Sequence, residues 1–129
     1  KKILLPIALL SLCFYGSGCA TATRTHGKDF DGSKVSQIIK GKTSADDIVA
    51  MFGTPRARQP EADDGERWIY SYVTATAHAY AVPFGGTHSE VTGGHKKILN
   101  ILLNKNHIVV NFTCEDGPLD PEKLDAHAY

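Results

Sequence analysis

The sequence predicts an α+β domain in which two N-terminal helices pack on a three-stranded antiparallel sheet. Three observations support this fold class. Apolar residues recur at helical spacing in two segments between residues 32 and 53, residues 68–80 alternate with a period of two, and two apolar runs flank the turn sequence Asn104-Lys105-Asn106. The alternation places large rings on one face of the first strand and small groups on the other, so the helices could cover either face.

The first helix is expected to start at Gly32. Val35, Ile38 and Ile39 follow at steps of three and four residues, which gives a short helix with one apolar stripe. Gly41 ends the pattern, as glycine commonly does just after the last turn of a helix. We therefore predict one short amphipathic helix before residue 41.

Thr43 is predicted to cap the second helix. Its hydroxyl can accept a hydrogen bond from the backbone amide of Asp46, and the Asp46 carboxylate can reach back to the amide of Thr43. The negative charge also favours the N-terminal end of a helix. The apolar face of the helix and the residues that end it follow in order: Ile48, Met51 and Phe52, then Gly53 and Pro55.

Three strands are predicted in the second half of the chain. The first runs from Trp68 to Tyr80, and the other two cover residues 98–103 and 108–114. Residues 83–94 contain two Gly-Gly pairs and are predicted to be a mobile connection. The predicted buried face of the last two strands consists of alternating apolar residues: Leu99, Ile101, Leu103, Ile108, Val110 and Phe112.

The N-terminal region predicts a signal peptide over residues 1–18. Two lysines precede an apolar run that is too short to span a bilayer, and Gly16-Ser17-Gly18 stands before Cys19. A cysteine directly after small residues resembles the lipobox of bacterial lipoproteins, in which the cysteine becomes the first residue and carries the acyl chains. Cys19 is thus the predicted lipid attachment site. The alternative is an ordinary secretory signal cut near residues 20–22, which would remove Cys19.

The segment that follows the predicted lipid site is expected to be a flexible tether. Residues 19–31 are polar and, apart from Phe30, lack large apolar side chains, whereas residues 32–129 form the predicted domain. Ala20 rather than an aspartate follows Cys19. By resemblance to bacterial lipoproteins, this favours the outer membrane, with the domain facing the periplasm and held to the membrane by the lipid anchor.

Composition limits the possible functions. Without Lys1 and Lys2, the chain keeps 12 basic against 14 acidic residues. It therefore lacks the excess of positive charge that is typical of proteins that bind nucleic acid. After removal of the signal and lipidation of Cys19, Cys114 is the remaining free thiol, so the domain is not built on disulfides. We expect Cys114 to be a small buried apolar residue rather than a reactive thiol.

The segment over residues 39–55, followed by Trp68-Ile69-Tyr70, resembles the SmpA/OmlA (BamE-like) family of outer-membrane lipoproteins. The shared pattern is a glycine, a threonine cap, a helix, a Gly-x-Pro sequence and an aromatic pair that opens the first strand. The resemblance covers roughly residues 35–114 and mainly concerns structural motifs. Residues 75–94 depart from the family pattern.

This resemblance implies the ααβββ arrangement and a lipid-anchored, non-enzymatic accessory protein of the cell envelope. The implied partner is an envelope protein complex, such as the outer-membrane β-barrel assembly machinery. The same architecture occurs in a stress-induced (OsmE-like) lipoprotein and in secreted β-lactamase inhibitory proteins. A periplasmic inhibitor or a stress-induced binding lipoprotein is therefore the alternative.

The connection over residues 79–94 is the predicted partner-binding element. Tyr80 and Phe84 are its expected anchors and His88 a peripheral contact, because aromatic residues are enriched among interface hot spots. The alternative is that Phe84 folds back on its own sheet and belongs to the core.

Histidines near this connection raise the question of a metal site. His78, His88 and His95 could in principle hold zinc, but they lack the tight spacing of specific zinc motifs. We expect solvated side chains here. No oriented nucleophile and base or phosphate loop is recognisable, so we expect no enzyme activity, no cofactor and no metal.

Overall fold

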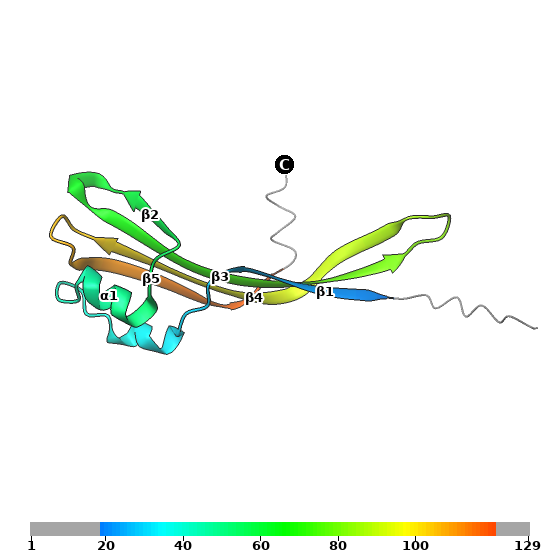
Figure 1. Ribbon diagram of the computed structural model, residues 1–129, viewed down its shortest axis with the longest axis horizontal. Helices are drawn as coiled ribbons and strands as arrows, with labels where there is room; N and C mark the ends of the chain where they lie inside the picture. Colours follow the sequence, from blue (N-terminus) through cyan, green and yellow to red (C-terminus); the bar gives the residue numbers. More distant parts are fainter. Residues whose placement is uncertain (1–18, 121–129) are drawn as a thin grey trace, which may run out of the picture.

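A computed structural model describes residues 19–120 of the chain. In this part, five antiparallel strands form one sheet, ordered β1-β3-β4-β5, with β2 also paired to β3 (Figure 1). The strands are β1 (Ala20–Gly27), β2 (Ala57–Pro60), β3 (Glu66–Ala81), β4 (Thr87–Leu103) and β5 (Val109–Pro118). The helical elements are the α-helix α1 (Ala45–Phe52) and the 3₁₀ helices η1 (Gly32–Gln37) and η2 (Ala62–Asp64).

The predicted arrangement of two helices on three strands is wrong. The second predicted helix is present as α1, but the first is only the six-residue 3₁₀ helix η1. At its end, Ile38 already has extended backbone angles and its side chain is buried. Glycine, serine and β-branched residues are weak helix formers, and a segment this short needs tertiary packing to stay helical. Burial of Ile38 from an extended backbone replaces the predicted helical stripe.

Helix α1 starts one residue later than predicted, because Ser44 rather than Thr43 caps it. The Ser44 hydroxyl accepts from the backbone amide of Asp47 at 3.2 Å, and Asp47 Oδ2 accepts from the amide of Ser44 at 2.9 Å. Thr43 is held elsewhere: its carbonyl accepts from Val109 N at 2.9 Å and its hydroxyl from Ile39 N at 2.8 Å. The capping box is therefore real but shifted by one residue.

The core lies between one end of the sheet and the α1 and η1 segment, which cover one face (Figure 1). Trp68 is 4 % exposed, and its Nε1 donates to Glu66 Oε2 at 2.7 Å. The Phe30 ring packs edge-on against Phe52 and Tyr70. The apolar residues of this core are Phe30, Ile38, Ala45, Ile48, Phe52, Trp68, Tyr70, Leu99, Ile101, Leu103 and Val109.

The predicted hairpin at residues 104–106 is confirmed. Asn104 Oδ1 accepts from the amides of Asn106 and Ile108 and so holds the turn between β4 and β5. The predicted buried face holds on β4 but fails on β5, where Val109 is fully buried and Val110 is 42 % exposed. A register shift explains the error, because residues 102 and 103 pair with 111 and 109, which leaves Val110 outside the ladder.

Residues 20–27 were expected in a flexible tether, but they form strand β1. This strand pairs with residues 72–79 of β3, and β2 pairs with residues 66–69 along the same edge. Alternating alanine and threonine residues suit a pleated strand, and threonine has a high preference for strands. Phe30 then enters the core, so the folded domain includes residues before 32.

Residues 87–94 were expected in a mobile connection, but they belong to strand β4. The connection between β3 and β4 is reduced to residues 82–86. The 16 residues of β3 span about 50 Å, whereas the eight residues of α1 span about 12 Å. The sheet is therefore far longer than the helical layer, and one end projects uncovered (Figure 1). We call residues 75–94 the arm and the remainder of residues 28–119 the head.

Candidate functional site

The arm is an antiparallel hairpin that projects from the head without a core of its own. Its strands stay in register from the pair Ala77 and Val91 to the pair Ala81 and Thr87. The turn is closed by a hydrogen bond from Val82 N to the carbonyl of Gly86 at 3.3 Å. Every residue from 81 to 90 is exposed. Backbone pairing, rather than apolar burial, holds this part of the chain together.

Phe84 stands at the outermost point of the turn and is fully exposed. The alternative that it folds back into the core is therefore wrong. Its φ is 74°, a left-handed conformation that bulky residues rarely adopt. A large ring in that conformation gains nothing from packing in the described structure, and apolar surface is costly to leave in water. Phe84 is thus the most conspicuous candidate for contact with something outside the chain.

The other two predicted contact residues lie close to Phe84 on the arm. Tyr80 and His88 are directly opposite each other in the β3 and β4 ladder, and their ring centroids are 5.3 Å apart. Tyr80 is 39 % exposed and Val82 is 36 % exposed. The structure therefore gathers Tyr80, Phe84 and His88 on the distal arm, although it does not test whether they bind a partner.

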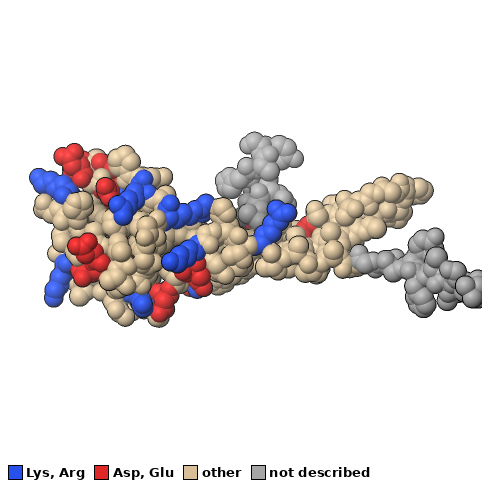
Figure 2. Space-filling model, in the orientation of Figure 1, with Lys and Arg blue, Asp and Glu red and all other residues tan. Residues whose placement is uncertain are grey.

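The arm differs from the head in charge. Glu90 is the one Asp, Glu, Lys or Arg between residues 75 and 94, and it lies opposite His78 in the ladder. In Figure 2 the acidic and basic side chains gather over the head, and the projecting end of the sheet is almost free of them. Exposed apolar surface, when it is contiguous, often marks an interaction site, and the arm exposes Tyr80, Val82, Phe84 and Val91.

Cys19 lies beside this arm of low charge. It is exposed, and the next residue, Ala20, pairs with Ala79 of β3. Side-chain hydrogen bonds across the same ladder hold the strand in place, between Thr21 and His78 at 3.2 Å and between Thr23 and Thr76 at 3.3 Å. The predicted lipid site is thus fixed near the tip of the arm rather than on a free tether.

Sequence reasoning missed this placement of Cys19. The available signal was the strict alternation Ala-Thr-Ala-Thr over residues 20–23, which matches the alternation of threonine and alanine over residues 74–77. The small and polar side chains of this segment provide no apolar face, so the residues alone predict a tether. A strand without an apolar face becomes recognisable only when its pairing partner is known.

The three histidines proposed for a metal site are not brought together. His78 interacts with Thr21, His88 with Tyr80, and His95 Nε2 lies 2.5 Å from Asp116 Oδ1. No group of three His, Cys, Asp or Glu side chains in residues 19–120 has the arrangement needed to hold a metal ion. The expectation of no metal and no cofactor stays a prediction.

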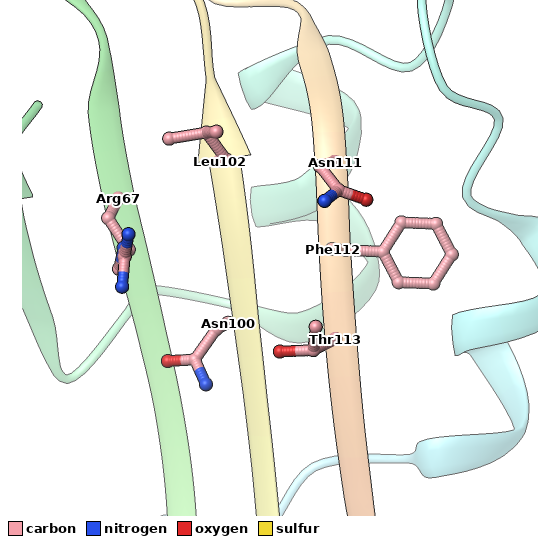
Figure 3. Close-up of a pocket in the computed structure, with 6 residues that line it drawn as sticks. All are labelled: Arg67, Asn100, Leu102, Asn111, Phe112 and Thr113. Carbon is pink, nitrogen blue, oxygen red and sulfur yellow. The ribbon is translucent and has the colours of Figure 1, made fainter. Parts of the chain in front are cut away.

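A shallow hollow of about 160 Å³ lies on the face of the sheet that α1 leaves uncovered (Figure 3). Arg67 borders it and forms an ion pair with Glu61 at 2.7 Å, so its guanidinium is already engaged. The hollow brings together no nucleophile and base that would indicate catalysis. Its lining residues are Arg67, Asn100, Leu102, Asn111, Phe112 and Thr113.

Cys114 was expected to be buried, but its side chain is exposed. Its strand, β5, lies at the edge of the sheet, where no further described strand covers it. Partial burial of the thiol, with the negative charges of Asp116 and Glu115, raises the pKa of Cys114. A raised pKa disfavours the thiolate, so this position does not have the properties of a reactive cysteine.

Comparison of the chain with protein-family models, curated proteins and solved structures finds no match. The site is therefore described by its own geometry. Within residues 19–120, no helix combines the length and apolar composition that a membrane crossing needs.

Proposed function

We propose that the chain is a lipid-anchored, non-enzymatic accessory protein of the bacterial cell envelope. Cys19 carries the lipid, the head faces the periplasm at the outer membrane, and the arm is the binding element. The observation that carries this proposal is the position of Cys19: it directly precedes a strand that pairs with the arm, in which Glu90 is the one acidic or basic residue. The proposed lipid site, at the start of β1, and the exposed arm are thus connected through one sheet.

Anchoring of this kind needs more than one acyl chain. A single myristoyl-type chain binds membranes only marginally, whereas two chains anchor stably. We therefore propose diacylation of Cys19, as the lipobox resemblance implies. Because β1 is paired along its whole length, the lipid would hold the arm close to the membrane surface and the head further away.

The proposed protein partner is an envelope protein complex. The resemblance to the SmpA/OmlA family suggested the outer-membrane assembly machinery, and that suggestion stays a prediction. The ααβββ arrangement shared by that family and by the inhibitor alternative is wrong for this chain, so neither partner is supported by the fold. The accessory role is supported by the exposed arm, whose residues 80–89 carry no charged side chain.

Metabolic labelling tests the lipid anchor. Radiolabelled palmitate should enter the wild-type protein and the Cys114→Ala variant, but not Cys19→Ala. Cys114→Ala is a matched control because Cys114 is also exposed and free. Label that persists in Cys19→Ala would contradict the proposal.

Affinity purification of the native, membrane-extracted protein tests the accessory role. We expect a defined envelope protein to be recovered in stoichiometric amount with the lipidated wild type. Recovery of the lipidated protein alone, after gentle extraction and chemical cross-linking, would refute the role in a complex and leave the lipid anchor intact.

A further inference from the structure

The position of Cys19 limits where the tip of the arm can lie. Ala20 pairs with Ala79, and Phe84 follows Ala79 by five residues along the chain. At about 3.3 Å per residue, this segment extends at most about 16 Å, because residues 82–84 belong to the turn. One leaflet of the hydrocarbon core of a bilayer is about 15 Å thick. A lipid on Cys19 would therefore bring Phe84 within reach of the same leaflet that holds the acyl chains.

The orientation of the molecule also places the tip of the arm towards the membrane. In Figure 1 the start of β1 and the turn between β3 and β4 lie at the same end of the molecule, and α1 lies at the opposite end. The charged surface of the head is likewise at the far end from the turn (Figure 2). Attachment at the start of β1 thus turns the uncharged end of the molecule towards the membrane and the charged end towards water.

The side chains of the distal arm suit a membrane interface. Val82 and Phe84 are exposed and apolar, and no described residue packs over Phe84. Tyr80 and His88 flank them with rings that have an apolar body and a polar tip, the type of residue that favours the boundary between lipid and water. Charged residues are costly in lipid, and none lies between Tyr80 and Ser89.

The backbone limits how deep the arm can enter. Strand β5 ends opposite His95, and Leu119 N donates to the carbonyl of Gly94. No described strand covers the outer edge of β4 over residues 87–93. Unpaired backbone amides and carbonyls are not tolerated in the hydrocarbon core, but they are hydrated in the interface. The tip can therefore lie among the headgroups with its apolar side chains at the acyl boundary, and it cannot cross the bilayer.

From these observations we infer that the tip of the arm is a membrane-contacting element: Val82 and Phe84 insert into the interface of the bilayer that holds the lipid of Cys19. This inference rests on the proposed lipid anchor and names what the arm binds. The tip then acts as a second attachment point beside the lipid. Two attachment points on one stiff sheet fix the orientation of the head relative to the membrane, which a lipid on a flexible tether would not do.

Fluorescence quenching tests the contact on the full lipidated chain. The protein is reconstituted on phosphatidylethanolamine and phosphatidylglycerol vesicles, with or without bromine on the acyl chains. Phe84→Trp places a reporter on the tip, and Val110→Trp places a control on an exposed position of the head. Trp68 is buried in the head and provides the same background in both variants.

We expect brominated lipid to remove several-fold more of the added emission from Phe84→Trp than from Val110→Trp, and vesicles to shift the Phe84→Trp emission to shorter wavelength. Equal quenching of the two variants on a chain that is lipidated and floats with the vesicles overturns the inference. Emission that changes only when an envelope protein extract is added also overturns it, in favour of a protein contact. Palmitate labelling of the same preparation separates the two failures, since an unlabelled chain contradicts the proposed function and the membrane contact together.

Discussion

The head and the arm are built from the same two strands but are stabilised in different ways. In the head, β3 and β4 bury apolar side chains against α1 and η1, and Trp68 is 4 % exposed. In the arm, the same strands bury no large side chain, and Phe84 is fully exposed. The sheet is therefore longer than the core requires. Length beyond the core costs conformational entropy without a gain from burial, so the arm is best explained by function.

A glycine contact marks the transition between the two regions. Gly94 on β4 lies so close to β3 that a Cβ atom would come within 1.9 Å of the Thr74 carbonyl oxygen, and its φ is 158°. The strands therefore approach each other more closely there than side chains allow. Next to it, the ladder shifts its register between Thr76 and Ala77. Such irregularities increase the local twist and bend a strand, which redirects the arm relative to the head.

The largest predicted effect comes from comparing a buried aromatic residue of the head with an exposed one of the arm. Trp68→Ala should lower the free energy of unfolding by about 3 to 5 kcal/mol, because it leaves a cavity in the core and leaves Glu66 without its hydrogen-bond donor. Phe84→Ala should change it by less than about 0.5 kcal/mol, since the ring contacts no core residue. Chemical denaturation followed by circular dichroism measures both. Equal losses in the two variants would mean that the arm is part of the cooperative core.

A smaller effect is predicted at the junction between head and arm. Gly94→Ala should cost about 1 to 3 kcal/mol, because alanine rarely adopts the required backbone angles and its methyl group would meet the Thr74 carbonyl. Gly93→Ala is the matched control, since no atom lies within 4 Å of the added methyl group and its φ is ordinary. Thermal melts and amide exchange of the arm should both distinguish the two variants. Indistinguishable behaviour would show that the strands can move apart there without loss.

The smallest effect concerns the cap of α1 and depends on pH. Hydrogen bonds from the backbone amide and the hydroxyl of Ser44 lower the pKa of Asp47. Because the folded pKa lies below the unfolded one, the carboxylate stabilises the fold above the unfolded pKa, and this contribution disappears as the pH falls through the folded pKa. Asp47→Asn should therefore melt below wild type at neutral pH, and the difference should shrink below about pH 4.

Asp46→Asn controls for the loss of one negative charge in the same helical turn, since Asp46 is not part of the capping box. A difference between Asp47→Asn and wild type that persists unchanged at low pH would exclude the carboxylate as its source.

The sequence predicted the head better than the arm because apolar periodicity reports burial. Helix α1, strand β3 and the turn at Asn104 were recognisable from spacing and turn chemistry. The shift of the cap from Thr43 to Ser44 was not, because it depends on a backbone hydrogen bond from Val109, far along the chain. Val110 was misplaced for a similar reason, since a bulge reverses the alternation that the sequence alone suggests.

The arm could not be predicted from periodicity. Its alanine, threonine and glycine residues provide no apolar face, and glycine pairs are typical of loops. Tyr80, Phe84 and His88 were singled out for their residue types, but their place on a projecting hairpin became clear only from the pairing of β3 and β4. The position of Cys19 beside the arm likewise follows from the pairing of β1, which no local signal specifies.

Our main inference is that the head is stabilised by its own core, whereas the tip is held by backbone pairing alone and is protected further when it contacts a membrane. Amide hydrogen exchange tests it directly, with the unlipidated Cys19→Ser chain in buffer and the lipidated chain on vesicles. We predict slow exchange over the core strands in both states and fast exchange over residues 80–88 in buffer that slows on vesicles. Exchange over residues 80–88 that is equally fast in both states, or already as slow as the core in buffer, would contradict the account.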